Sequence, residues 1–160
     1  MMVTETTSPI GPIRVTLHEG RLCALEFADR WKRGASDAQR RRAPTKEDPS
    51  EVLERLRAYF DGDLDAFAGL RVEAAGTAFQ RSVWTAMRRI APGLTASYGD
   101  LARQIGTPSA SRAVGAASGS NPVGIVIPCH RVIGSNGTLT GYGGGLERKR
   151  WLLRHEGVML

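Results

Sequence analysis

The sequence predicts a mixed α/β (α+β) protein, with a small N-terminal α/β domain followed by a mostly helical domain that has a helix-turn-helix and a wing-like hairpin. Residues 10–27 alternate apolar and polar side chains, which is typical of half-buried strands. Residues 79–119 carry apolar side chains at helical spacing, interrupted by turns rich in glycine and proline. Charge also divides the chain: residues 1–80 hold 12 Lys or Arg and 13 Asp or Glu, whereas residues 81–160 hold 10 and 3.

The N-terminal domain is predicted at residues 1–73. Residues 10–27 should form a hairpin that turns at Glu-Gly-Arg, with Cys23 packed in its second strand as a small hydrophobe. Residues 30–50 are polar and should form an exposed loop, which includes the run Arg40, Arg41 and Arg42.

A helix is predicted over residues 50–60, with Ser50 as its cap and Asp61-Gly62 as its end. Its apolar positions follow helical spacing: Val52, Leu53, Leu56, Tyr59 and Phe60. Residues 61–76 read as a linker with one short strand.

The C-terminal domain is predicted at residues 77–160 and should contain three helices before residue 120. The first runs from Phe79 to Ile90, and the second starts at Ser97-Tyr98-Gly99-Asp100 and ends near Ile105. A turn at 106–109 leads to the third helix, 111–119, which is rich in alanine and glycine. This order is typical of a helix-turn-helix, although ordinary helix packing would explain it as well.

A wing-like hairpin is expected after these helices. The apolar run 125–133 should pair with a strand at 138–142, because Asn136-Gly137 is a strong hairpin turn signal. Gly143-Gly144-Gly145 should then open a last helix that ends at Glu156-Gly157.

Composition excludes several classes of protein. No apolar stretch approaches the ~18–20 residues of a membrane span, and the N-terminus does not resemble a secretory signal. Two distant cysteines, Cys23 and Cys129, make no disulfide framework, so we expect reduced thiols and a cytoplasmic protein. The basic C-terminal half suggests a polyanionic partner, most simply nucleic acid, although solubility alone could account for the charge.

The chemistry of the chain centres on Pro128-Cys129-His130-Arg131. A thiol attacks as its thiolate and needs a base or a positive field to form it at neutral pH. His130 could be that base, but neighbouring side chains on a strand point to opposite faces, so contact requires a bend or a bridging water. A carboxylate should orient the imidazole, with Glu156 as the first candidate and Asp100 as the second.

Other readings of this stretch fit less well. Two cysteines and three histidines offer no metal-ligand spacing, so no metal is expected. The glycines near residue 144 lack the Lys-Ser/Thr of a phosphate loop, and no dinucleotide fingerprint follows a strand. A cysteine hydrolase and an inert buried cysteine remain open at this point.

Residues 121–133, N-P-V-G-I-V-I-P-C-H-R-V-I, closely resemble the active-site signature of the methylated-DNA–protein-cysteine methyltransferases, the O6-alkylguanine-DNA alkyltransferases. The segments S-Y-G-D-L-A, S-R-A-V-G-A-A, L-T-G-Y-G-G-G-L-E-R-K-R-W-L-L and H-E-G follow in the family's order and spacing. The resemblance covers about residues 77–157 and implies an RNase H-like fold for the N-terminal domain. Relatives that lack alkyl transfer replace the cysteine, which is present here.

The resemblance implies a role for each site residue. Cys129 would accept the alkyl group, His130 would take its proton through a water, and Glu156 would orient His130. Catalysis would also involve Asn121, which braces the turn, and Tyr98, which donates to guanine N3. The substrate pocket would be lined by Tyr142, Gly143, Val132 and Ser118. DNA would be contacted by Arg112, Tyr98, Ser97, Ser111, Ala113 and Gly115, with Arg112 filling the space left by the extruded base.

The function implied is direct and irreversible transfer of an alkyl group from O6-alkylguanine, and from O4-alkylthymine, in double-stranded DNA. The target base is flipped out, the recognition helix lies in the minor groove with little sequence readout, and the protein acts once, as a monomer without a cofactor. Gly143 and Gly124 depart from the family by removing side chains at the pocket rim. A DNA-binding regulator and a lesion-binding protein without chemistry remain alternatives.

Overall fold

The computed structural model describes residues 1–30 and 47–160, which form two compact units at residues 1–74 and 75–160. Most of the exposed loop predicted at residues 30–50, with Arg40, Arg41 and Arg42, lies outside the described residues. None of the helices in the described ranges has the length and apolarity of a membrane span.

The N-terminal unit is built on an antiparallel sheet of three strands in the order β1 (Met2–Thr6), β2 (Ile13–His18) and β3 (Arg21–Phe27). The predicted hairpin is therefore correct, and its turn uses a left-handed backbone at Glu19 and Gly20, with φ of 51° and 74°. The strand β1 was not predicted; it pairs with β2 from Met2↔Leu17 to Thr6↔Ile13.

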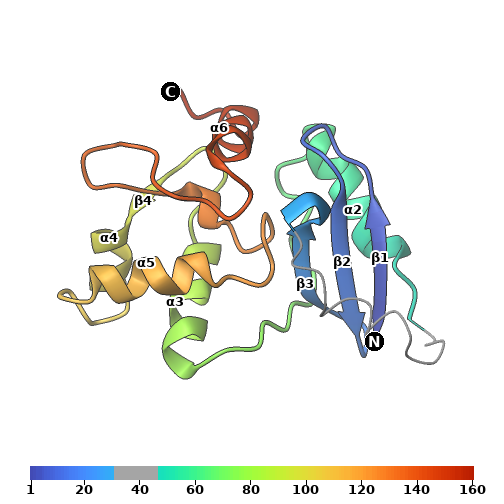
Figure 1. Ribbon diagram of the computed structural model, residues 1–160, viewed down its shortest axis with the longest axis horizontal. Helices are drawn as coiled ribbons and strands as arrows, with labels where there is room; N and C mark the ends of the chain where they lie inside the picture. Colours follow the sequence, from blue (N-terminus) through green and yellow to red (C-terminus); the bar gives the residue numbers. More distant parts are fainter. Residues whose placement is uncertain (31–46) are drawn as a thin grey trace. The chain divides into compact units, whose positions relative to one another are not determined.

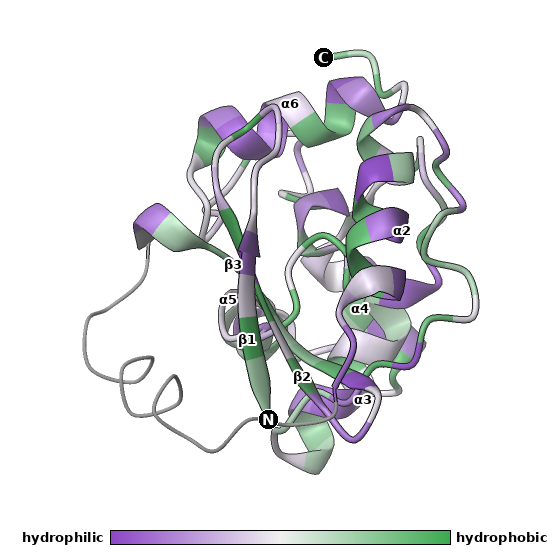
Figure 2. Ribbon diagram, turned by 90° about the vertical axis from the view of Figure 1, so that its right-hand side faces the viewer, coloured by the Kyte–Doolittle hydropathy of each residue, from purple (hydrophilic) through white to green (hydrophobic). Residues whose placement is uncertain are grey.

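Helix α2 (Ser50–Phe60) lies against one face of this sheet (Figures 1 and 2), where Val52, Leu56 and Tyr59 are buried. Pro49, not Ser50, occupies the N-cap, and the Ser50 backbone N–H donates to Asp48 at 2.9 Å. The short strand expected in 61–76 is a single parallel bridge between Leu22 and Val72.

The C-terminal unit begins with three helices that pack on one another: α3 (Ala78–Arg88), α4 (Tyr98–Gln104) and α5 (Ser111–Gly119) (Figure 1). Helices α3 and α4 start at capping boxes, Thr77 with Gln80 and Ser97 with Asp100. Trp84 on α3 donates its indole N–H to the Ala117 carbonyl of α5 at 2.8 Å. The predicted helix-turn-helix is α4 and α5.

The predicted strand pairing of 125–133 with 138–142 is wrong. Only β5 (Val132–Ile133) is extended, and it pairs in parallel with β4 (Ala96–Ser97). Residues Cys129–Arg131 form a 3₁₀ turn, η2, and Ile125 has a left-handed backbone with φ of 68°, which breaks an extended run. The Asn136-Gly137 turn exists, closed by a bond from Gly134 N–H to the Thr138 carbonyl at 2.9 Å, but it joins no pair of strands.

Helix α6 (Leu146–His155) packs against η2. Lys149, Leu152 and Leu153 are its buried residues, and hydrophilic and hydrophobic segments alternate along it (Figure 2). Its last turn leads directly to Glu156, which caps the helix and is buried.

Candidate active site

Cys129 begins η2 and is partly exposed, whereas its neighbours are buried. The turn before it is braced by Asn121, whose amide donates to the Ile127 carbonyl at 2.8 Å and accepts from the Val123 N–H at 2.9 Å. The Cys129 N–H donates to the same Ile127 carbonyl, at 2.8 Å. The bend that a Cys–His pair requires is therefore built from a side-chain brace and a 3₁₀ turn.

His130 is 0% exposed and bonds to Glu156 through Nε2, 2.9 Å from Oε2. An ionised carboxylate only accepts, so Nε2 carries the proton of the neutral ring and Nδ1 is left as an acceptor. Within the described residues, Nδ1 is buried without a hydrogen-bond partner. The structure thus brings Glu156 to His130, while Asp100 serves in the cap of α4 and pairs with Arg103.

Arg131 completes this buried cluster. Its guanidinium donates to both Glu156 oxygens, from Nε at 2.7 Å and from Nη2 at 2.8 Å, and its Nη1 donates to the Ile90 carbonyl at 2.6 Å. The guanidinium of Arg131 therefore connects three segments: Ile90 just after α3, the 3₁₀ turn η2, and Glu156 just after α6. The sequence analysis assigned Arg131 no role.

Burial and hydrogen bonding set the protonation of this cluster. Burial would raise the pKa of Glu156, but the bonds from Arg131 and His130 outweigh it and hold the pKa at about 2. Burial lowers the pKa of His130 despite the nearby carboxylate, and burial raises the pKa of Cys129 despite Asn121 and Lys149. At neutral pH the cluster holds a protonated thiol, a neutral imidazole and an ionised carboxylate.

Lys149 of α6 is a second buried cation that the sequence analysis missed. It is 0% exposed, and its Nζ donates to the carbonyls of Val132 at 2.6 Å and Thr140 at 3.1 Å. Its charge acts on Cys129 and favours the thiolate. Burial lowers the pKa of Lys149, as expected for a cation with only neutral hydrogen-bond partners.

Tyr98 and Tyr142 lie on different segments of the C-terminal unit. The Tyr98 hydroxyl, at the start of α4, is 2.6 Å from the Thr140 hydroxyl. Burial, with a smaller effect from the charge of Cys129, raises the pKa of Tyr142 well above its ordinary value. Both tyrosines are partly buried.

The remaining residues predicted for the pocket differ in exposure. Val132 and Ser118 are buried, and Gly143 is exposed. A Cβ added at Gly143 would meet nothing within 4 Å, so this position has room for a side chain.

The residues predicted to contact DNA belong to the helix-turn-helix. On α5, Arg112 and Ala113 are exposed, while Ser111 and Gly115 are partly exposed, and Gly115 lies against the ring of Tyr98. Ser97 caps α4, with its hydroxyl accepting from the Asp100 N–H at 3.0 Å. Arg112 is thus the charged side chain that this end of α5 presents to solvent.

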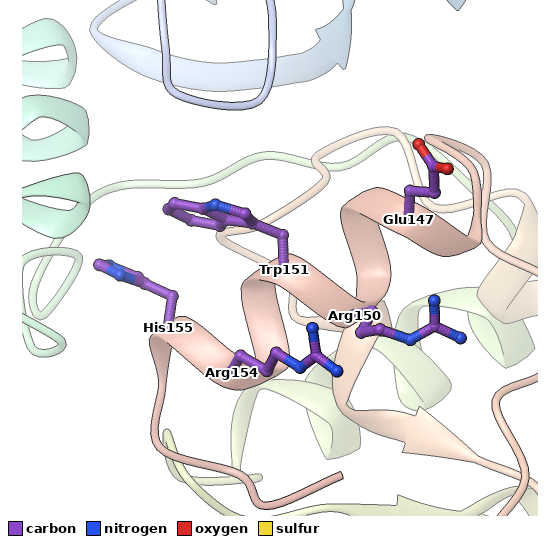
Figure 3. Close-up of a pocket in the computed structure, with 5 residues that line it drawn as sticks. All are labelled: Glu147, Arg150, Trp151, Arg154 and His155. Atoms are coloured by element: carbon purple, nitrogen blue, oxygen red, sulfur yellow. The ribbon is translucent and has the colours of Figure 1, made fainter.

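A separate pocket lies on α6, and Cys129 is not among the residues that line it. It is lined by Glu147, Arg150, Trp151, Arg154 and His155, with the Trp151 and His155 rings stacked at 4.8 Å (Figure 3). None of the predicted site residues lines it. Among the described residues, no group of three His, Cys, Asp or Glu side chains is arranged to hold a metal ion.

Comparison with known proteins identifies the family. Residues 78–158 match the model described as 6-O-methylguanine DNA methyltransferase, DNA binding domain. Residues 1–74 match the model of the ribonuclease-like domain of the same methyltransferase. The chain belongs to the 6-O-methylguanine DNA methyltransferase family. The N-terminal match confirms the RNase H-like fold that the resemblance implied.

Individual relatives of this methyltransferase family match nearly all of the chain. The methylated-DNA–protein-cysteine methyltransferase of Shigella flexneri is 45% identical over 167 residues, covering 100% of this chain and 98% of the relative. The one from Methanosarcina acetivorans is 44% identical over 150 residues, covering 94% of each. A crystal structure of Mycobacterium tuberculosis OGT in complex with DNA matches with a TM-score of 0.83 and 43% identity, covering 95% of this chain and 90% of that one.

Acid should destabilise this methyltransferase through the buried cluster. The pKa of Glu156 is about 2 in the fold and ordinarily 4.5, so its stabilising contribution, about 3 kcal/mol, is present above pH 4.5 and is lost as the pH falls toward 2. His130, with a lowered pKa, contributes nothing above its ordinary 6.5, where it is neutral in both states, and opposes the fold as the pH falls below that value. Urea unfolding at pH 7, 5 and 3 should show a falling free energy of unfolding. In Glu156→Gln, the loss of unfolding free energy below pH 4.5 should be smaller than in the unmodified protein. An equal loss in both proteins would show that Glu156 is not the group that titrates.

Proposed function

We propose that this protein repairs O6-alkylguanine, and O4-alkylthymine, in double-stranded DNA by moving the alkyl group irreversibly onto Cys129. The observation that carries the proposal is the buried Nδ1 of a neutral His130, a residue that is held by Glu156 and directly follows the partly exposed Cys129 in the chain. This arrangement suits a single nucleophile with its own base. The family match supports the same chemistry.

The proton and electron movements are simple. Nδ1 of His130 accepts the Cys129 proton through a bridging water, and the charged imidazole is stabilised by Glu156. The thiolate attacks the alkyl carbon in line with the C–O bond, which breaks as the C–S bond forms. Guanine leaves with the electron pair and takes up a proton. The product thioether is stable, so one molecule of protein repairs one base.

DNA is engaged by the helix-turn-helix in this proposal. Helix α5 lies in the minor groove, where its small residues allow close approach and little sequence readout. Arg112 enters the duplex where the target base is extruded, at a cost of a few kcal/mol for flipping. Tyr98 donates to guanine N3, while Ser97, Ser111, Ala113 and Gly115 contact the DNA. The protein acts as a monomer, inside the cell where DNA is its substrate.

The decisive experiment mixes the purified protein with a duplex that contains one O6-methylguanine. We expect intact and peptide mass spectrometry to show one added methylene on the Cys129 peptide, stopping at one equivalent. A protein that stays unmodified yet still shifts the duplex would instead be a lesion-binding protein. Repeated turnover on an ester would instead indicate a hydrolase.

Arg112→Ala should separate base flipping from chemistry. Loss of the exposed guanidinium leaves the thiol and its base intact but removes the group that replaces the extruded base. We expect repair of duplex DNA to slow at least about tenfold more than reaction with free O6-methylguanine. A tenfold difference corresponds to about 1.4 kcal/mol in the free energy of base flipping. Single-turnover rates on both substrates test this. The matched control is Arg103→Ala, which removes an exposed arginine from α4, and equal losses on both substrates would refute the role of Arg112.

A further inference from the structure

We propose that Thr140 is a positioning residue that fixes the direction of the Tyr98 hydroxyl proton during alkyl transfer. This inference rests on the function proposed above. It starts from the distance of 2.6 Å between the two hydroxyl oxygens, which join the first residue of α4 to the segment between β5 and α6. Both side chains are partly buried, so water competes less for this hydrogen bond than it would for a bond between exposed hydroxyls.

Thr140 is itself held from its other side. Its carbonyl accepts from Lys149 Nζ at 3.1 Å, and the same ammonium, 0% exposed, also binds the Val132 carbonyl at 2.6 Å. The Tyr98 ring, in turn, lies against Gly115 of α5, where an added Cβ would be 3.8 Å from Cδ1. The hydroxyl pair therefore sits between two supports, Lys149 behind Thr140 and α5 behind Tyr98.

The roles of the two hydroxyls follow from their proton count. Each has one proton to donate and lone pairs that accept. Guanine N3 only accepts, so Tyr98 must donate to it, and its oxygen is then free to accept from Thr140. A threonine that donates in this way leaves the Tyr98 proton directed at the substrate. Without the threonine hydroxyl, the tyrosine proton can rotate away or pair with water.

Thr140→Val keeps the shape of the side chain and removes its hydroxyl, and with it the proton that Thr140 donates to Tyr98. We expect the single-turnover rate of methyl transfer from duplex O6-methylguanine to fall about three- to tenfold, the effect of one net hydrogen bond. Thr140→Ser should restore a rate near that of the unmodified protein. Thr138→Val, which removes an exposed hydroxyl of the same segment, is the matched control and should leave the rate unchanged.

Two further measurements distinguish positioning from packing. In a Tyr98→Phe background, Thr140→Val should have no further effect, because the threonine acts only through the tyrosine oxygen. On a duplex with 3-deaza-O6-methylguanine, which lacks the N3 acceptor, Thr140→Val should also lose its effect. Equal losses in both backgrounds and on both lesions would overturn the inference. If the unmodified protein transfers no methyl group to Cys129, the proposed function itself fails, whatever the variants do.

Discussion

Cys129→Ser should accept no methyl group while its binding to duplex DNA stays intact. Serine fits where the partly exposed cysteine stands, and the Asn121 brace and the 3₁₀ turn do not depend on sulfur. A serine hydroxyl is a far weaker nucleophile than a thiol and needs stronger activation than a neutral imidazole provides through a water. Retained transfer would remove Cys129 as the acceptor.

The second cysteine provides the matched control. Cys23 lies on β3 of the N-terminal unit, where burial, with the negative charge of Glu73, raises the pKa of its thiol. We expect Cys23→Ser to transfer the methyl group at the unaltered rate. Peptide mass spectrometry on both variants, beside gel-shift titrations with the damaged duplex, separates the acceptor from DNA binding.

Glu156→Ala should cost both folding and chemistry. The carboxylate binds both Arg131 and His130 in a buried cluster, and its removal leaves a buried guanidinium held by one carbonyl. Breaking such a buried pair costs about 3–5 kcal/mol, because the remaining charge is not compensated. Urea unfolding at pH 7 measures this loss. A change below about 1 kcal/mol would show that the cluster does not stabilise the fold.

Glu156→Gln isolates the chemical part of this effect. An amide keeps the size of the side chain but provides no negative charge to stabilise the imidazolium that forms as Cys129 loses its proton. We expect methyl transfer to slow by about 100-fold or more, the contribution typical of a positioned general base. The control is the double variant Arg131→Met/Glu156→Leu, which should regain stability over Glu156→Ala without regaining transfer. An unchanged rate in Glu156→Gln would remove Glu156 from the relay.

The helices of the C-terminal unit could be predicted because their signals are local. Thr77 with Gln80 and Ser97 with Asp100 form the capping boxes of α3 and α4. Helical spacing then places the buried side chains on one face. The strand β1 was missed because its five residues are too few to show a clear alternation of apolar and polar side chains. Its burial alternates only over the last residues of the strand.

The false strand at 125–133 has a physical explanation. An apolar run predicts a buried strand by hydrophobicity, but here the Ile127 carbonyl is bonded to Asn121 and to the Cys129 N–H, so it is not available to a ladder. Pro128 interrupts the run, Pro122 and Gly124 lie just before it, and proline within a run argues against a central strand. This signal was present in the sequence and could have corrected the prediction.

The chemistry of the site was more predictable than its support. The pairing of His130 with Glu156 follows from the need of an imidazole base for a carboxylate, and the structure brings the two together. Nothing local in the sequence shows that Arg131 would reach both Glu156 and the Ile90 carbonyl, or that Lys149 would bind two carbonyls. These contacts join residues from 9 to 41 positions apart, so only the folded chain reveals that Arg131 and Lys149 support this cluster.

The double duty of Glu156 has a consequence for how this protein can evolve. The Glu156 carboxylate binds His130 and, through Arg131, also joins three separate segments of the chain. Most substitutions of Glu156 therefore destabilise the fold, and selection removes them whatever their effect on activity. Gly143, by contrast, is surrounded by open space, and a new side chain there meets no folding penalty from its neighbours. If Gly143 borders the substrate pocket as proposed, mutation there can change the range of lesions accepted while the buried cluster of Glu156 stays fixed.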